Sequence, residues 1–266
     1  MLRFRHATSA SQGARSYQED SSAVWPSEHA PARQSASGPD DDLALIAVLA
    51  DGMGGHIGGA LASRTICTTF ISALAMEPGP VLERLKAALS AANSAVAERV
   101  AENASLMGMG ATLVGAAFSV RGLEWVSVGD SPLYLVRRGE IARLNEDHSL
   151  APMLERMVAD GRLSAQQARR DPRRHYLRSA MSGEELDLVD ISGRPLVLEA
   201  GDAIVVASDG IHTLDDAAIA RLVTEHLADG PSTTAGALIR AVDRAGDTLQ
   251  DNTTVVVVAV EDLRSL

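Results

Sequence analysis

The chain has 266 residues, 46% of them apolar and 22% charged, values typical of a globular protein with a sizeable core. A formal net charge of −11 argues against nucleic-acid binding, which needs a surface that neutralises phosphates. Aromatic residues make up only 3%, so we expect a core built mainly from Ala, Val, Leu and Ile.

The single cysteine, Cys67, lies within a helical pattern. It can form neither an intramolecular disulfide nor a thiolate zinc site, and we predict a buried thiol without a functional role. Residues 1–10 lack the apolar segment of a signal peptide, and no apolar run approaches the length of a membrane span. We therefore expect a cytoplasmic protein that does not enter a membrane.

In the first half of the chain, an apolar run ends at Asp51 and predicts a strand that is buried on both faces. Apolar residues at helical spacing predict two helices after it. The segment 26–42 is rich in Pro, Ser, Ala and Asp, which predicts a long, mobile hairpin loop. The expected strands span 3–10, 22–25 and 43–50, and the expected helices span 58–75 and 80–103.

The second half is predicted to return to strands and to end with another helix pair. Strands at 123–128 and 132–137 are expected to be antiparallel neighbours of a strand at 109–120, and Arg138-Gly139 to form a tight turn. The charged segment 153–170 predicts a helix. Further strand character covers 186–198, 203–208 and the residues after Asp251, and the late helices are expected at 215–228 and 233–245.

The strands therefore come in consecutive groups, interrupted by one helix pair early and another late. This order favours an α+β fold over alternating βαβ units. Two mostly antiparallel sheets packed together, with helices over the outer faces, would bury all of these strands. No linker divides the chain, so we predict a single domain over residues 1–262.

Acidic residues recur where predicted strands end or begin. Asp51, Asp130 and Asp209 each follow a strand, and Asp251 precedes the last one. Arg15, Glu19 and Asp20 stand together in R-S-Y-Q-E-D, and the glycines after Asp51 let the backbone approach closely. An Asp-Gly hairpin turn explains the Asp51 segment alone equally well.

The recurrence favours one site where strand ends converge. Two like unit charges at about 4 Å repel by roughly 4 kcal/mol at an effective dielectric constant of about 20. A divalent metal ion would relieve this repulsion.

These motifs together resemble those of the bacterial metal-dependent Ser/Thr protein phosphatases, the PPM or protein phosphatase 2C family. The resemblance covers nearly the whole chain, and the motifs stand in the family's order. They are R-S-Y-Q-E-D, A-D-G-M-G-G-H, M-G-A-T-L, V-G-D-S, N-E-D-H-S, A-S-D-G and Q-D-N-T-T-V-V-V-V. The resemblance implies a four-layer α/β/β/α fold, in which helix pairs flank a central antiparallel β-sandwich. It also implies a two-metal site at one edge and a flap subdomain at about 150–185.

The resemblance also implies a role for each acidic residue. Asp51 would bridge two metal ions, with the Gly52 carbonyl, Asp209 and Asp251 as further ligands. Glu19 and Asp20 would reach a metal directly or through water, and Asp130 with Asp209 would hold a third, weaker ion. Arg15 would grip the substrate phosphate, since a guanidinium forks onto two phosphoryl oxygens.

The implied chemistry follows from these ligands. Hard oxygen donors favour Mg²⁺ or Mn²⁺ over zinc. Two such ions can activate a shared water and support an in-line displacement at phosphorus. The resemblance therefore implies hydrolysis of phosphoserine and phosphothreonine by a bridging metal-bound hydroxide, without a covalent phosphoenzyme.

Two positions, Met53 and Pro132, depart from patterns known in the family. Met53 stands where some members have a histidine that acts as a general acid, and it cannot donate a proton. His56 is a weak substitute, because a histidine bonded to a turn backbone is the more frequent situation. Pro132 replaces an arginine beside Asp130, which leaves the surroundings of a third ion open. Asp147 and His148 match a motif that we expect to be structural.

The flap contains the one basic concentration of the sequence, which comprises Arg169, Arg170, Arg173, Arg174 and Arg178. It could capture substrate through phosphate or acidic side chains. A solvated, charged helix and loop is an equally good interpretation.

Three functions remain open from the sequence. The leading one is a Mg²⁺- or Mn²⁺-dependent Ser/Thr protein phosphatase. A regulatory pseudophosphatase that binds phosphoproteins without turnover, and a phosphatase for small phosphoesters, are the alternatives. The expected partners are phosphorylated proteins and a cognate Ser/Thr kinase, and we expect a monomer.

Overall fold

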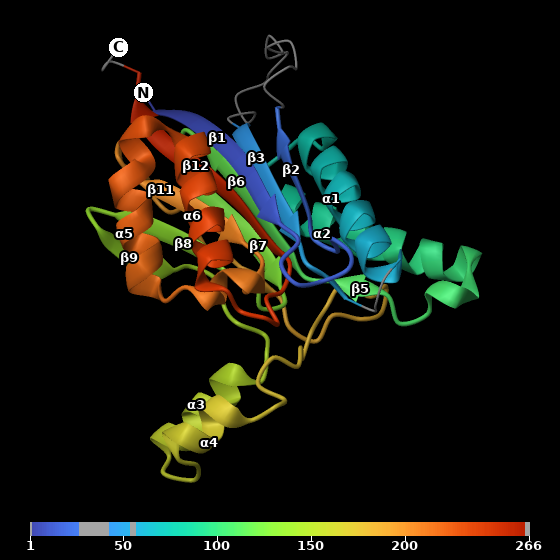
Figure 1. Ribbon diagram of the computed structural model, residues 1–266. Coiled ribbons are helices and arrows are strands. Elements are labelled where there is room, and N and C mark those ends of the chain that lie inside the picture. The colour runs from blue at the N-terminus through green and yellow to red at the C-terminus, as the bar shows by residue number, and fades with distance from the viewer. Residues whose placement is uncertain (1, 27–42, 54–56, 264–266) are drawn as a thin grey trace.

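The computed structural model describes residues 2–26, 43–53 and 57–263 of the chain. Within these residues, two five-stranded antiparallel sheets pack against each other, and a helix pair covers the outer face of each (Figure 1). The expected four-layer α+β architecture is confirmed. Residues 27–42 of the predicted loop at 26–42 lie outside the described residues, and so does His56.

One sheet has the strand order β10-β7-β6-β3-β2 and is covered by helices α1 and α2. Its strands are β2 (Ser21–Trp25), β3 (Leu43–Ala50), β6 (Leu113–Ser119), β7 (Gly122–Val128) and β10 (Asp190–Ile191). The helices are α1 (Ile57–Met76) and α2 (Val81–Glu102), followed by the short 3-10 helix η1 (Ala104–Leu106). A separate two-stranded ladder joins β4 (Gly52–Met53) to β5 (Gly110–Ala111).

The other sheet has the order β1-β12-β11-β8-β9 and is covered by helices α5 and α6. Its strands are β1 (Leu2–Ser11), β8 (Leu133–Arg137), β9 (Glu140–Arg143), β11 (Ala203–Ala207) and β12 (Thr253–Asp262). The helices are α5 (Asp216–His226) and α6 (Pro231–Ala245), with 3-10 helices η2 (Asp209–Thr213) and η3 (Leu227–Asp229) before and between them. β1 and β12 pair along ten residues, with Leu2 opposite Asp262.

The position of β3 between two hydrophobic cores explains its uninterrupted apolar sequence. Ile46 and Val48 pack into the core under α1 and α2, while Leu45 and Leu49 face the other sheet. Successive side chains of a strand point to opposite faces, so a strand between two cores must be apolar at every position. The predicted strand buried on both faces is confirmed.

Helix α1 lies on β2 and β3 and packs against α2. It is long and apolar enough, by length and composition alone, to cross a membrane, so the expectation that no run reaches this length was wrong. Its apolar residues Ile66 and Phe70 are fully buried in the core of this layer. Cys67 is buried there as well, as expected, and its thiol donates to the Ser21 carbonyl.

Three expected strands differ from the structure. The strand at 132–137 does not neighbour β6, because the chain turns at Gly129 (φ +102) and Pro132 and crosses to the other sheet as β8. Residues 186–198 form only the two-residue strand β10 and one isolated bridge, since Gly193 and Pro195 interrupt the run. The strand at 109–120 is broken at Thr112 into β5 and β6.

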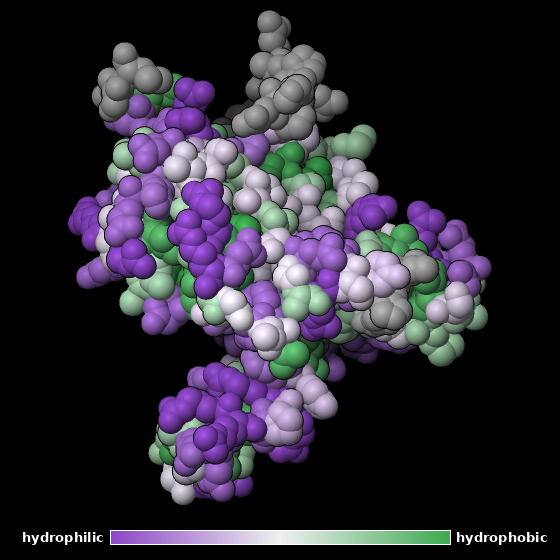
Figure 2. Space-filling view, in the orientation of Figure 1, coloured by the Kyte–Doolittle hydropathy of each residue, from purple (hydrophilic) through white to green (hydrophobic). Residues whose placement is uncertain are grey.

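The predicted helix at 153–170 is two helices, α3 (Ala151–Ala159) and α4 (Ala165–Arg170), separated by a turn with Gly161 at φ +69. Ser164 begins α4 with a capping box that it shares with Gln167. These helices project from the sandwich (Figure 1), and hydrophilic side chains cover most of their visible surface (Figure 2). We call residues 150–185 the flap.

Candidate active site

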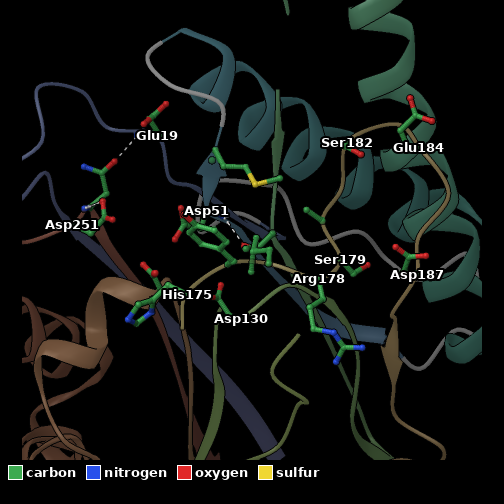
Figure 3. Close-up of a pocket in the computed structure, with 18 of the residues that line it drawn as sticks. Glu19, Asp51, Asp130, His175, Arg178, Ser179, Ser182, Glu184, Asp187 and Asp251 are labelled. Carbon is green, nitrogen blue, oxygen red and sulfur yellow. Dashed lines mark hydrogen bonds between the residues drawn. The ribbon is translucent and has the colours of Figure 1, made fainter. Parts of the chain in front are cut away.

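One pocket of about 830 Å³ lies where the predicted acidic strand ends meet. Seven of the predicted site residues line it, namely Arg15, Glu19, Asp51, Gly52, Asp130, Asp209 and Asp251. Figure 3 shows Asp51, Asp130 and Asp251 on one side of this pocket, with Ser182, Glu184 and Asp187 on the other. Asp20 does not line the pocket, but its charge interacts with those of Asp51, Asp209 and Asp251. The structure therefore brings together acids from widely separated parts of the chain.

Asp51 is held at the end of β3 by the break between β5 and β6. Its backbone N–H donates to Thr112 Oγ1 at 2.9 Å, and the Thr112 N–H donates to the Asp51 carbonyl at 2.9 Å. Thr112 Oγ1 also hydrogen-bonds Ser131 Oγ at 2.7 Å, which ties this strand end to the turn that contains Asp130. The interruption at Thr112 therefore fixes two of the acidic positions.

Gly52 follows at a point of close approach between backbone segments. A Cβ atom there would lie 2.5 Å from the Glu19 carbonyl oxygen, closer than any real Cβ contact. Only glycine lets the strand end and the N-terminal loop meet at this distance. The glycine therefore brings Asp51 and Glu19 to the same pocket.

Two buried carboxylate oxygens in the site have no hydrogen-bond partner. Ser208 Oγ donates to Asp20 Oδ2 at 2.8 Å, but Asp20 Oδ1 is buried without a partner, and so is Asp209 Oδ1. Buried polar atoms are almost always hydrogen-bonded, so such orphans need an explanation. A bound cation would supply the partner that each of these oxygens lacks.

The carboxyl groups of this cluster resist ionisation when no cation is present. Burial raises the pKa of Asp20 to about 6 and that of Asp130 to about 7. Burial, followed by the charges of neighbouring aspartates, also raises the pKa of Asp51 and of Asp209. Desolvation and like-charge repulsion disfavour the charged form, and a bound cation would reverse both effects.

The donor set fits a hard divalent ion. Within the described residues, no three acidic, histidine or cysteine side chains form a cluster that would enclose an ion unaided. Mg²⁺ is usually bound through one or two carboxylates and keeps several waters, so a sparse set of carboxylates with a nearby carbonyl at Gly52 suits it. The oxygen donors of the predicted set do not favour zinc.

Arg15 lies at the rim of the pocket, about half exposed, where its Nη2 donates to Asp251 Oδ2 at 2.5 Å. The loop that carries it is fixed by Asn252, a residue to which the sequence assigned no role. Asn252 Nδ2 donates to the carbonyls of Gln12 at 2.8 Å and Tyr17 at 2.9 Å, and its Oδ1 accepts the Glu19 N–H at 2.8 Å. Its position beside Asp251 was the only hint of this role.

Asp130 is only 8% exposed, and an arginine from β9 lies next to it. Arg143 Nη2 donates to the Asp130 carbonyl at 2.7 Å, and its Nη1 pairs with Asp147 at 3.3 Å. A guanidinium is therefore present beside Asp130, although Pro132 supplies none. His148 Nδ1 accepts the Gly129 N–H at 3.2 Å, which agrees with a structural role for the segment.

The flap contributes residues that the sequence did not assign to the site. His175, Tyr176 and Arg178 line the pocket. Of the basic concentration, Arg173 pairs with Asp171 at 2.9 Å and Arg174 pairs with Glu155 at 2.7 Å, so both are partly neutralised within the flap. Only Arg178 of the five reaches the pocket lining. Met53 lines the pocket too.

Comparison with known proteins agrees with this arrangement. The family model described as protein phosphatase 2C matches residues 34–234. The serine/threonine protein phosphatase PstP of Mycobacterium tuberculosis is 34% identical over 222 residues, which cover 82% of this chain and 41% of PstP. The chain thus spans about two fifths of the length of that relative.

Solved structures give the same result over the whole fold. The crystal structure of the M. tuberculosis phosphatase PstP superposes with a TM-score of 0.77 at 30% identity, covering 98% of this chain and 100% of that one. The PstP catalytic domain in complex with two manganese ions superposes with a TM-score of 0.76 at 30% identity, with the same coverage. The fold, the arrangement of the acidic strand ends and these similarities lead to one conclusion: this chain belongs to the protein phosphatase 2C family.

Proposed function

We propose that the chain hydrolyses phosphoserine and phosphothreonine in proteins, with Mn²⁺ or Mg²⁺ held by the carboxylates of the pocket. The observation that carries this proposal is the pair of buried, partnerless oxygens on Asp20 and Asp209. The names of the matching relatives support the reaction class, and the manganese ions in the PstP catalytic domain support the choice of metal.

The acidic residues of the pocket would bind the metal ions. Asp51, Asp209 and Asp251, with the Gly52 carbonyl, would hold the ions, and Asp20 and Glu19 would reach them directly or through water. Asp130 and Asp209 would hold a third ion. Bound ions supply Lewis acidity at the phosphoryl group and lower the pKa of water.

Arg15 would exchange its ion pair with Asp251 for the substrate phosphate. Its guanidinium is half exposed at the pocket rim and already lies beside the cluster, so it needs no large movement to meet a phosphoryl group. A guanidinium binds two phosphoryl oxygens in a planar, bidentate manner. Asn252 would act as a positioning residue, because it holds both ends of the loop that carries Arg15.

Removing a proposed ligand tests this function. The Asp209→Ala variant is expected to lose more than about 100-fold of the manganese-stimulated turnover of phosphoserine and phosphothreonine peptides, since the loss of even a supporting contact to a metal ligand has effects of that size. EDTA should abolish the wild-type activity, and added Mn²⁺ should restore it. Asp229→Asn, which changes an exposed carboxylate on η3, should retain full activity.

The substrate panel separates the remaining alternatives. Wild-type activity that survives EDTA would exclude a metal-dependent reaction. Binding of phosphopeptides without turnover at saturating Mn²⁺ would identify a pseudophosphatase instead. A kcat/KM that is higher for small phosphoesters than for phosphopeptides would point to a metabolite phosphatase.

The proposal also covers the oligomeric state of the protein, its compartment and its partner kinase. We infer a monomer that works in the cytoplasm opposite a Ser/Thr kinase acting on the same proteins. The buried, lone thiol of Cys67 is compatible with a reducing compartment.

A further inference from the structure

A histidine of the flap lies beside the carboxylate cluster. His175 lines the same pocket as Asp51, Asp130 and Asp209, and it is close enough to Asp209 and to His212 for their charges to interact. Figure 3 shows its imidazole on the side of the pocket that holds Asp51, Asp130 and Asp251, away from the opposite wall formed by Ser182, Glu184 and Asp187.

The backbone around His175 is fixed to the body of the protein. The carbonyl of Tyr176 accepts the Leu150 N–H at 3.0 Å, and the Arg178 N–H donates to the carbonyl of His148 at 2.8 Å. Both partners lie in the segment that closes the turn beside Asp130, where His148 is buried. The flap therefore presents His175 from a turn that these two hydrogen bonds hold in place, and not from the projecting helices.

His175 lies on the side of the pocket toward which the leaving group of the substrate departs. Asp51 is half-buried at the floor of the pocket, whereas His175 is exposed at its mouth. A phosphorylated protein can reach the floor only with its phosphate, so the serine or threonine oxygen that departs points toward the mouth. In an in-line displacement this oxygen lies opposite the attacking water.

That departing oxygen needs a proton. A serine or threonine alkoxide is a strong base and a poor leaving group, and general acids assist such steps by about 10²- to 10⁴-fold. Arg15 and Arg178 do not release protons in proteins. Met53 has none to give, and the aspartates must be ionised to bind a cation. Glu184, Glu185 and Asp187 also line the pocket, and Figure 3 shows Glu184 and Asp187 on the wall opposite Asp51 and Asp130. The other described pocket residues with a proton to give are His175 and those with hydroxyl groups, of which Tyr176 is 62% exposed.

We propose that His175 is a catalytic residue that protonates the leaving oxygen of the substrate. This inference rests on the proposed function. Water attacks phosphorus as the bond between phosphorus and the side-chain oxygen breaks. The electron pair of that bond remains on the oxygen, which takes the proton from the imidazolium of His175. Inorganic phosphate and the free hydroxyl are the products, and the imidazole regains a proton from solvent.

The leaving group itself provides the test. With Mn²⁺ at saturation, His175→Gln is expected to lower kcat for a phosphothreonine peptide by about 100-fold and kcat for p-nitrophenyl phosphate by no more than about twofold. p-Nitrophenolate is a stable anion that departs without a proton, so only the peptide reaction should depend on the histidine. Calorimetric Mn²⁺ affinity should equal that of the wild type, because the role proposed for His175 is not that of a ligand.

Two controls accompany this comparison. His226→Gln removes a histidine at the end of α5, outside the pocket lining, and should behave as the wild type with both substrates. Tyr176→Phe removes the neighbouring proton donor and keeps the ring. Its kcat ratio for the two substrates should be that of the wild type.

Five results would overturn the inference. Equal losses on both substrates, or a fall in Mn²⁺ affinity, would assign His175 a structural or ligand role. An unchanged peptide kcat in His175→Gln, or a selective loss in Tyr176→Phe, would place the proton donor elsewhere. A wild-type protein without Mn²⁺-dependent turnover of either substrate would instead refute the proposed function, and the inference would fall with it.

Discussion

At the scale of single residues, the pocket depends on positions where no side chain fits. At Gly52, a Cβ atom would meet the Glu19 carbonyl oxygen at 2.5 Å, and neither backbone segment can move without displacing an acidic residue of the site. Gly52→Ala is therefore expected to reduce the free energy of unfolding by about 1–3 kcal/mol, the usual effect of overpacking. It should also weaken Mn²⁺ binding, because Asp51 and Glu19 separate.

Urea unfolding and calorimetric titration with Mn²⁺ measure these two effects. Gly193→Ala is the matched control, since a Cβ atom there meets nothing within 4 Å and the backbone is not in the left-handed region. If the two variants were equally stable and bound Mn²⁺ equally well, the close approach at Gly52 would have no consequence for the site.

At the scale of elements, a buried arginine joins the two helices that cover β3. Arg84 of α2 is 3% exposed, and its Nε donates to the Leu74 carbonyl at 3.0 Å, near the end of α1. The last carbonyls of a helix have no partner within the helix and carry a partial negative charge. Arg84→Met keeps most of the apolar contact but removes the donor, and should lower the free energy of unfolding by about 1.5–3 kcal/mol.

Denaturant unfolding at constant m-value measures this loss. Lys86→Met on the same helix removes an exposed ion pair with Glu83 at 2.9 Å and should change stability by less than about 1 kcal/mol. If Arg84→Met lowered the free energy of unfolding by no more than Lys86→Met does, the guanidinium would not stabilise the end of α1.

At the scale of the whole molecule, the stability of the metal-free protein should depend on pH through its acidic pocket. The pKa of Asp130 is raised from 3.8 to about 7 by burial, so the folded state holds this proton more tightly than the unfolded chain does. The resulting stabilisation is complete below pH 3.8 and is lost as pH rises through about 7. In EDTA, the wild type should lose stability relative to Asp130→Asn between about pH 5 and 7.5.

The comparison with Asp130→Asn is needed because other groups act in the opposite direction. Burial lowers the pKa of His148 and of His212, which makes the folded state more stable as pH rises. These contributions are shared by the two proteins and cancel in the difference between their melting temperatures. A difference that does not change with pH would mean that Asp130 titrates normally. Saturating Mn²⁺ should remove the pH-dependent difference only if Asp130 takes part in binding.

The sequence predicted most helices and strands, the antiparallel pairing of β6 with β7, and the convergence of the acidic strand ends, but it placed β8 in the wrong sheet. An apolar run such as that of β3 states that a strand is buried on both faces, and this was confirmed. Nothing in the sequence of β8 indicates which of the two sheets it joins. The turn at Gly129 that directs the chain to the other sheet is visible only in the structure. The acids were found because each lies beside a strand, so their pattern repeats.

Asn252 and His175 were missed for a different reason. The amide of Asn252 gains its role from carbonyls that lie 235 and 240 residues away in the chain. His175 belongs to a segment whose charged composition suggested a solvated surface, and only the pairing of the flap with the residues around His148 brings it to the pocket. The spacing of residues along the chain therefore could not predict the contacts of Asn252 or the position of His175.

The pairing of β1 with β12 has a consequence for biosynthesis. The ribosome delivers Leu2 long before its partner Asp262, so the first strand stays unpaired until the residues of β12 have emerged. Until then the sheet containing β11 and β8 lacks β12, the strand that joins β1 to β11, and the loop bearing Arg15 and Glu19 has no Asn252 to hold it. A nascent chain therefore cannot complete the proposed phosphate- and metal-binding pocket before β12 has been synthesised.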